Sequence, residues 1–176
     1  MIPIEIRVLS KEDNTSQFEC GVVELDQFLK QYAKQNQFRH FIGTTYVAIS
    51  KKQILGFVSV SACSIRIDEL SRITNKKMPL YPLPILRLTR MAIDKRYQHH
   101  GIGKQLLKFV LLLALKQKEQ FGCFGLVVDA KENSMKFYEQ FGFAAFDSVA
   151  GALDIRPFAK SIFLATSTIE KGLKDA

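Results

Sequence analysis

The segment that decides the fold is Gln98-His99-His100-Gly101-Ile102-Gly103-Lys104. It follows the segment Leu86–Ile93, which we interpret as a strand, and precedes a stretch whose apolar residues recur with helical spacing to about Lys118. We therefore predict a strand, a glycine-bearing turn and the start of a helix. The first amides of a helix have no partners within it and carry partial positive charge, so a turn of this kind can hold a phosphate.

A Gly-x-Gly turn alone is a weak signal, because many helices begin after glycine for packing reasons. The two better-known phosphate motifs do not fit. A P-loop needs GxxxxGK[ST], which the chain lacks, and a dinucleotide-binding turn needs a third glycine where Leu106 stands. The residues alone leave a phosphate site and a packing turn as alternatives.

Outward from this turn, the pattern alternates between strands and helices. Further strands are predicted at residues 4–8, 44–50, 54–64, 124–129, 144–149 and 160–165, and further helices at residues 24–36 and 132–141. The proline-rich run 79–84 is predicted to be a loop, and the tail after residue 165 is polar. Residues 1–176 therefore predict one α/β domain with helices on both faces of a mixed sheet.

Composition limits the class of protein. A 47% hydrophobic and 24% charged chain of 176 residues is typical of a folded domain, and its longest apolar runs are too short to span a membrane. No signal peptide is apparent at the N-terminus, so we expect a cytoplasmic protein with no membrane partner. Cys20, Cys63 and Cys123 form no metal-binding pattern, so no metal is expected. The net charge of +8 favours a polyanionic ligand: a nucleotide cofactor, a nucleic acid or an acidic protein.

Two blocks together resemble the GNAT N-acetyltransferase family. The family motif [RQ]xxGx[GA] is matched by Gln98, Gly101 and Gly103, directly after the strand that ends at Ile93. The later block, from Val128 through Asn133 to Phe143, is similar to the late strand and helix of that family. The resemblance spans essentially the whole chain and implies a GNAT fold with a largely antiparallel central sheet and acetyl-CoA as co-substrate.

The resemblance also implies roles for individual residues. Backbone groups of the 91–93 strand would pair with the pantetheine arm, amides of the turn would take the pyrophosphate, and Tyr138 would stand beside the sulfur as general acid. One departure from the family pattern is a histidine where close relatives often carry a first glycine. By composition alone, Tyr138 in an aromatic cluster also fits a core residue. The implied coenzyme contacts are Met91, Ala92, Ile93, Gln98, His99, His100, Gly101, Ile102, Gly103, Lys104 and Asn133.

A narrower likeness is carried by Phe18–Gly21 with Leu25–Leu29 and by the loop at residues 81–84. These resemble GNAT toxins of toxin–antitoxin pairs, of the TacT and AtaT kind. That likeness implies that the protein acetylates the α-amino group of aminoacyl-tRNA and forms a homodimer. It also implies a partner antitoxin with a ribbon-helix-helix part, and contact with DNA only through that antitoxin. Cationic side chains are predicted to contact RNA, although each one also fits a solvated face. They are Lys30, Lys34, Arg39, Arg66, Arg72, Lys76, Lys77, Arg87 and Arg90.

Two alternatives to the tRNA acceptor stay open at this point. The first is acetylation of a small-molecule amine or of a protein N-terminus. The second is a GNAT-like module that binds acetyl-CoA without catalysis.

Overall fold

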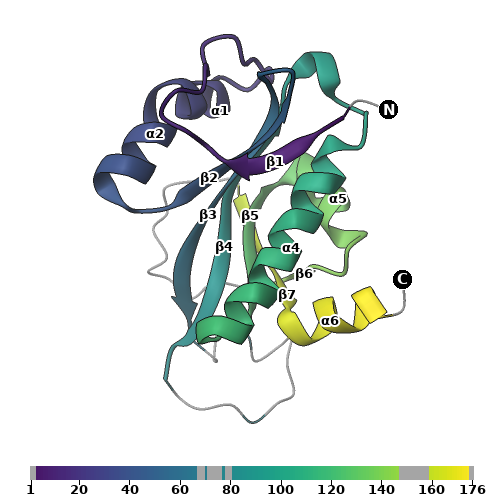
Figure 1. Ribbon diagram of the computed structural model, residues 1–176. Helices are drawn as coiled ribbons and strands as arrows, with labels where there is room; N and C mark the ends of the chain where they lie inside the picture. Colours follow the sequence, from purple (N-terminus) through teal and green to yellow (C-terminus); the bar gives the residue numbers. More distant parts are fainter. Residues whose placement is uncertain (1–2, 67–69, 71–76, 78–80, 147–158, 175–176) are drawn as a thin grey trace. The chain divides into compact units, whose positions relative to one another are not determined.

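A computed structural model describes residues 3–66, 70, 77, 81–146 and 159–174, whose elements are labelled in Figure 1. The strands in this part of the chain hydrogen-bond in the order β1-β2-β3-β4-β5-β7-β6. They are β1 (Glu5–Val8), β2 (Thr44–Ser50), β3 (Gln53–Ile65), β4 (Leu83–Ile93), β5 (Gly125–Lys131), β6 (Ala144–Ala145) and β7 (Ala159–Ala165).

The helical elements alternate with these strands along the chain. The longer α-helices are α4 (Ile102–Phe121) and α6 (Thr166–Lys174), and shorter ones are α1 (Val23–Gln27), α2 (Ala33–Gln35) and α5 (Met135–Glu139). Two π-helical segments, η1 (Phe28–Tyr32) and η2 (Asn36–His40), continue α1 and α2, and two 3₁₀ turns are η3 (Lys95–Tyr97) and η4 (Glu132–Ser134).

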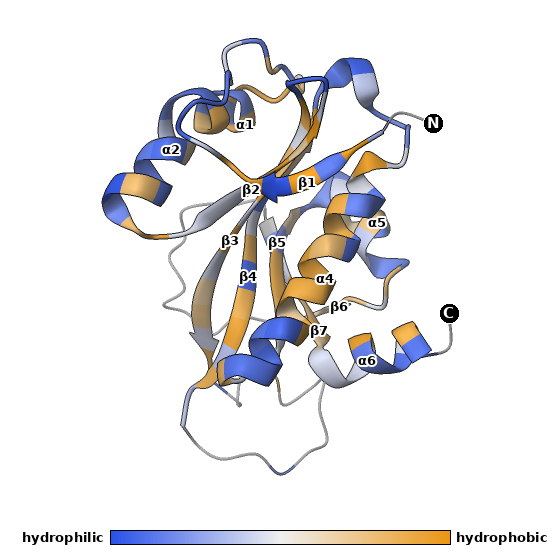
Figure 2. Cartoon of the chain, viewed as in Figure 1, coloured by the Kyte–Doolittle hydropathy of each residue, from blue (hydrophilic) through white to orange (hydrophobic). Residues whose placement is uncertain are grey.

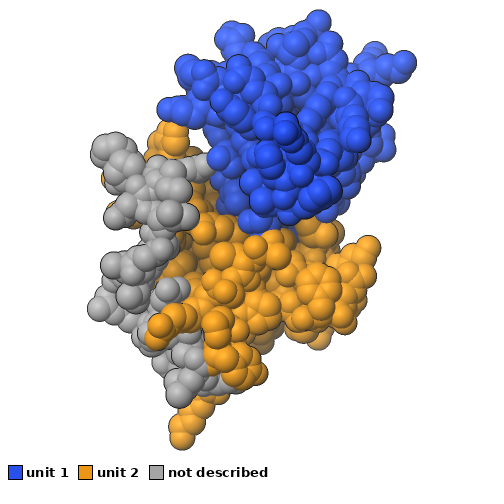
Figure 3. Space-filling model, turned by 90° about the vertical axis from the view of Figure 1, so that its left-hand side faces the viewer, with its two compact units in different colours: residues 1–61, 88–110 blue, residues 62–87, 111–176 orange. Residues whose placement is uncertain are grey.

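The chain forms two compact units, which Figure 3 colours separately. Unit 1 comprises residues 1–61 and 88–110, and unit 2 comprises residues 62–87 and 111–176.

Unit 1 is built on the antiparallel strands β1, β2 and β3. Val47 and Phe57, which are paired across β2 and β3, belong to a core that includes Phe18 and Phe28. The neighbouring residue Tyr46 instead packs on Phe109 of α4, with ring centroids 4.8 Å apart. Successive side chains of a strand point to opposite faces, so the segment α1–η2 and the first half of α4 cover opposite faces of the sheet in this unit.

Unit 2 is built on the antiparallel pair β5–β7, which runs from Gly125↔Ala165 to Lys131↔Ala159, with β6 on the other side of β7. Its core gathers Leu83, Ile85, Val127 and Phe163. Every residue of β5 from Gly125 to Val128 is buried, which explains the unbroken apolar run in the sequence.

Strand β4 starts earlier than predicted. The run 79–84 was expected to be a loop, but β4 begins at Leu83 and contains Pro84. Proline is tolerated here because it stands at the beginning of the strand, where its missing N–H removes little from the ladder. Its carbonyl still accepts a hydrogen bond from the Phe124 amide at 2.7 Å.

The first helix also differs from the prediction. The helix predicted at residues 24–36 is based on the spacing of Leu25, Phe28, Leu29 and Tyr32, which places Tyr32 on the buried stripe. In the structure Tyr32 is 49% exposed, and Ala33 is fully buried in its place. The π turn η1 explains the shift, because its i→i+5 pattern holds an extra residue and moves the buried stripe one position along the chain.

The C-terminal part holds two further corrections. The predicted strand 144–149 is seen as the two-residue β6, and residues 147–149 lie outside the described part of the chain. The tail that was predicted to be merely polar forms α6. Its N-terminal Thr166 is buried and donates from Oγ1 to the Cys123 carbonyl at 2.7 Å, while Ile169 packs inward. The four-residue spacing of Ile169 and Leu173 was the available signal.

The predicted class, a mixed α/β fold with a largely antiparallel sheet, is confirmed. Among the described residues, no helix combines the length and the apolar character that crossing a bilayer requires.

Candidate functional site

The link between β4 and α4 is anchored by Asp94, which is not among the site residues predicted from the sequence. Its side chain is 0% exposed and accepts hydrogen bonds from the Arg96 guanidinium (Nε and Nη2, both 2.8 Å) and from the Glu19 amide at 3.3 Å. Burial raises the pKa of this carboxyl, but the Arg96 and Glu19 hydrogen bonds outweigh it and hold the pKa below its usual value. An aspartate that bonds the amide two residues on is a recognisable turn signal.

Gln98 ties the turn back to the end of β4. Its side-chain nitrogen donates to the Ile93 carbonyl at 3.1 Å and to the Cys20 carbonyl at 3.0 Å. The motif glutamine therefore acts here as a brace through its side chain. Because the Gln98 side chain is occupied in this way, the contact with the coenzyme that we predict for Gln98 would be made by its backbone.

The turn itself takes a left-handed conformation at two residues. His99 has φ +64° and Gly101 has φ +79°. A non-glycine residue with positive φ is uncommon, which gives a physical reason for the glycine that close relatives often carry at the His99 position. His100 Nδ1 lies 2.7 Å from the Gln98 carbonyl, which closes the turn.

The helix α4 opens directly on this turn. Its first turn is closed by the bond from the Gln105 amide to the Gly101 carbonyl at 3.2 Å. The amides of residues 102–104 precede that bond and lie at the positive end of a 20-residue helix. Together with the exposed Lys104, this arrangement has the charge and donors for a pyrophosphate.

The strand segment predicted to hold the pantetheine arm lies in the same unit. Ala92 is buried in the core of unit 1, and Met91 and Ile93 are half-buried. Unit 1 thus contains the strand end, the brace and the turn, which account for ten of the eleven predicted coenzyme residues.

The eleventh predicted coenzyme residue, Asn133, and the predicted general acid, Tyr138, lie in unit 2. Asn133 is exposed in η4. Tyr138 of α5 is 5% exposed, with its ring 5.1 Å from that of Phe137 and 5.6 Å from that of Phe143. Burial raises the pKa of Tyr138 above the ordinary value of 10, so the hydroxyl is in its protonated form at neutral pH.

Several of the cationic residues predicted to contact RNA make contacts within the chain, and others are exposed. Lys34 Nζ donates to the Lys11 carbonyl at 2.7 Å and to the Asp13 carbonyl at 2.6 Å. Arg87 forms an ion pair with Asp129. The Arg90 guanidinium lies 4.1 Å from the centroid of the Phe28 ring. Lys30, Arg66 and Lys77 are exposed, and Arg72 and Lys76 lie outside the described residues.

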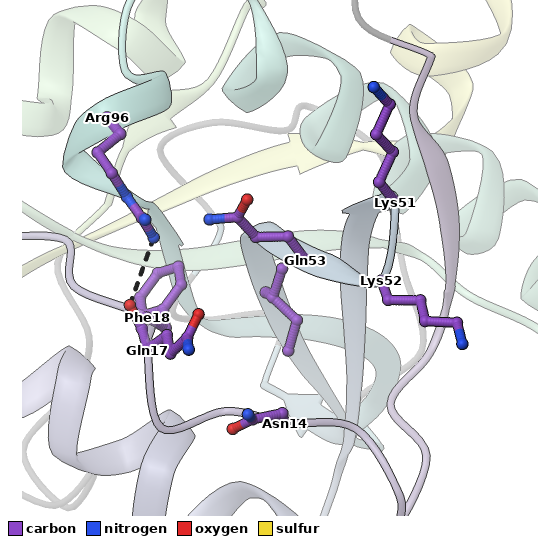
Figure 4. A pocket seen from close by; sticks show the side chains of 8 residues that line it. Asn14, Gln17, Phe18, Lys51, Lys52, Gln53 and Arg96 are labelled. Atoms are coloured by element: carbon purple, nitrogen blue, oxygen red, sulfur yellow. Dashed lines mark hydrogen bonds between the residues drawn. The ribbon is translucent and has the colours of Figure 1, made fainter.

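A small cavity of unit 1 lies beside Arg96 (Figure 4). Its volume of about 260 Å³ is below the roughly 300–1,000 Å³ typical of pockets that enclose a drug-sized ligand. The Lys51 and Lys52 side chains extend outward in Figure 4, and Arg96 is already committed to Asp94. The cavity is therefore not a site for the whole coenzyme. It is lined by Asn14, Gln17, Phe18, Lys51, Lys52, Gln53, Ile54 and Arg96.

Comparison with known families decides the class. The sequence profile of the acetyltransferase (GNAT) domain matches residues 42–145, which is more than half of the chain and includes the turn and Tyr138. The chain belongs to the GNAT acetyltransferase family. The family and the enzyme class, which the turn and the later block together predicted, are thereby confirmed.

Individual relatives of this GNAT chain point to narrower groups. A tRNA-acetylating toxin of Mycobacterium tuberculosis (strain ATCC 25618 / H37Rv) is 26% identical over 140 residues, covering 78% of this chain and 82% of the relative. A probable glucosamine 6-phosphate N-acetyltransferase of Drosophila melanogaster is 26% identical over 136 residues, covering 77% of this chain but 55% of that protein. The crystal structure of AtaTR bound with AcCoA is similar with a TM-score of 0.77 and 26% identity, covering 97% of this chain and 98% of that one.

Proposed function

We propose that this GNAT protein is an acetyl-CoA-dependent N-acetyltransferase that acetylates the α-amino group of aminoacyl-tRNA and so blocks translation. The observation that carries the proposal is the turn at residues 98–104, where a left-handed Gly101 leads into the first amides of α4. The similarity to a tRNA-acetylating toxin and to AtaTR bound with AcCoA supports the choice of acceptor and donor.

Two groups of this chain, the backbone amides at the end of β4 and the Tyr138 hydroxyl, would take part in acetyl transfer. Acetyl-CoA supplies an activated acetyl thioester. Backbone amides at the end of β4 would polarise the thioester carbonyl, as oxyanion donors do. The acceptor amine, whose pKa of about 8 is lowered further by esterification to tRNA, is largely neutral without a dedicated base. As its nitrogen bonds to the carbonyl carbon and the C–S bond breaks, Tyr138 would donate its proton to the leaving sulfur. The proton that the new ammonium then loses would return to the Tyr138 phenolate through water.

Several further expectations belong to the same proposal. The family match begins in unit 1 and ends in unit 2, which supports one acetyltransferase domain over residues 1–176. The toxin-like N-terminal block supports a homodimer and a ribbon-helix-helix antitoxin that links the protein to DNA. Charged tRNA is the substrate we propose, so we place the protein in the cytoplasm. We propose no metal in the reaction.

The test has two stages. Calorimetry on the purified protein is expected to register coenzyme A binding, since every later role depends on the pyrophosphate turn. Thiol release from acetyl-CoA is then measured with aminoacyl-tRNA, with polyamines or amino sugars, and with no acceptor. Release only with aminoacyl-tRNA supports the proposal, and lack of coenzyme binding would overturn it.

A second candidate is acetylation of a small-molecule amine, favoured by the likeness to the glucosamine 6-phosphate enzyme. Turnover with an amino sugar and none with aminoacyl-tRNA would select it. Coenzyme binding without turnover of any amine would leave a non-catalytic acetyl-CoA-binding module.

A further inference from the structure

The helical segment of residues 28–42 ends in an unusual way. Phe41 adopts a left-handed backbone conformation, φ +56° and ψ +34°, and its side chain is 82% exposed. Helices commonly end on a left-handed residue, but that residue is usually glycine because a side chain is strained there. Here the chain carries a strained backbone and a phenyl ring in water at the same residue. Strain of this kind is a reason to look for a function.

Neighbouring contacts hold this conformation in place. The amides of Phe41 and of Ile42 both donate to the Asn36 carbonyl, the latter at 3.2 Å. Directly afterwards, a Cβ added to Gly43 would stand 2.9 Å from the Val60 carbonyl oxygen, so only glycine allows the backbone to pass this close to β3. Phe41 and the 62% exposed Ile42 are thus presented to solvent by a fixed backbone.

The same segment offers a second exposed ring and positive charge. Tyr32 is 49% exposed because the π turn η1 moves Ala33 into the core in its place. Lys30, Arg39 and His40 are exposed, and no aspartate or glutamate occurs from residue 28 to residue 42. Figure 2 shows hydrophobic and hydrophilic colours side by side along this helical segment. Two π segments within one helix add a feature that is frequent at functional sites.

We propose that this aromatic–basic segment, residues 28–42, binds unpaired nucleotides of RNA by stacking a base on Phe41 and contacting phosphates with Lys30 and Arg39. Exposed aromatic side chains beside cations suit single-stranded RNA, since its unstacked bases present a flat face and its backbone is anionic. A duplex hides those faces, and an acidic protein would use the charges but not the rings. Naming the RNA as the 3′ acceptor end of tRNA rests on the proposed function, whereas binding of unpaired RNA does not.

The probe is a fluorescein-labelled five-nucleotide RNA that ends in CCA, with a matched probe that has the same phosphates but abasic sugars. Fluorescence anisotropy on the full chain compares wild type, Phe41→Gly and Phe41→Trp. Glycine relieves the backbone strain, so the Phe41→Gly variant is expected to fold with an equal or higher Tm. Its affinity for the RNA is expected to fall about tenfold, the size of one lost base–aromatic stack. Tryptophan is expected to retain the affinity.

Phe121, 71% exposed at the end of α4, supplies the matched control. The Phe121→Ala variant is expected to bind the RNA probe with the affinity of wild type. The wild-type protein is expected to bind the abasic probe with the same low affinity that Phe41→Gly has for the RNA probe. Equal affinity of wild type and Phe41→Gly, or of the two probes, would overturn the inference. A change of oligomeric state of Phe41→Gly in sedimentation velocity would also overturn it, because the ring would then serve a protein interface. Coenzyme A affinity is measured in parallel, so failure of the acetyltransferase proposal is seen separately.

Discussion

In the function proposed above, Tyr138 would meet a packing requirement and a catalytic requirement with one side chain. Its ring is packed between Phe137 and Phe143, as an aromatic cluster predicts, and burial raises the pKa of its hydroxyl. A phenol that is held neutral keeps the proton that a leaving thiolate needs. Packing also fixes the ring, so the hydroxyl is oriented before substrate arrives.

The Tyr138→Phe variant is expected to keep coenzyme A affinity and to lose about 10²–10⁴-fold in turnover, the range that general acid catalysis supplies. The substitution removes one oxygen and leaves the ring packing unchanged. Steady-state thiol release and calorimetry measure the two effects. Tyr46→Phe, at a half-buried tyrosine that packs on Phe109, is the control and is expected to turn over normally. Normal turnover of Tyr138→Phe would exclude the acid role.

His99 allows a test of the turn at the same scale. Because His99 has φ +64°, the His99→Gly variant is expected to raise the free energy of unfolding, by about 1 kcal/mol, and to retain coenzyme A binding through the backbone. Gly101→Ala places a side chain at φ +79° and is expected to destabilise by a similar amount and to weaken coenzyme A binding. Urea titration and calorimetry check both variants. If His99→Gly abolished coenzyme binding, the imidazole rather than the amide would be the ligand.

At the scale of elements, the link from β4 to α4 depends on a buried carboxylate. The Asp94→Asn variant replaces an acceptor of charged hydrogen bonds by an amide and is expected to lower the free energy of unfolding by about 1–3 kcal/mol at pH 7. The pKa of Asp94 in the folded protein is lowered from 3.8, so its stabilisation is present above about pH 4 and is lost as the pH falls through the lowered value.

Urea unfolding at pH 7 and at pH 3 tests this dependence. The difference in free energy of unfolding between wild type and Asp94→Asn is expected to narrow at pH 3, because that pH lies below the ordinary pKa of 3.8, so the unfolded wild-type chain takes up a proton that the folded carboxylate resists. Glu19→Gln is a suitable control, since the bond that Glu19 donates to Asp94 comes from its backbone and its own side chain is 54% exposed. A difference that is constant with pH would contradict the charged role of Asp94.

The elements show where sequence reasoning succeeds. The strands 44–50 and 54–64, the turn at 98–104 and the start of α4 follow from alternation, glycine placement and helical spacing, all of which are local. The π turns of the first helix could not be found in this way, because a shift of the buried stripe from Tyr32 to Ala33 depends on the fit against Phe57 and Val47. The Gln98 brace likewise needs Cys20, which is 78 residues away.

On the scale of the whole molecule, the net charge of +8 has two possible meanings. A diffuse excess of cations would attract any polyanion, and removing any two of them would weaken binding alike. A localised site would depend on which cations are removed. Lys34 and Arg87, two of the cations predicted from sequence, already have partners within the chain, so the charge available to RNA is narrower than composition implies.

The salt dependence of tRNA binding separates these two meanings. Each phosphate neutralised contributes about 0.7–0.9 to the slope of log K against log salt concentration. Substituting Lys30→Gln and Arg39→Gln together is expected to reduce that slope by about 1–2. Substituting Lys171→Gln and Lys174→Gln, two exposed lysines of α6, removes the same formal charge and is expected to leave the slope near that of wild type. Equal loss of slope in both double variants would make the cationic excess a general attraction, and the RNA site would then have to be sought elsewhere than in residues 28–42.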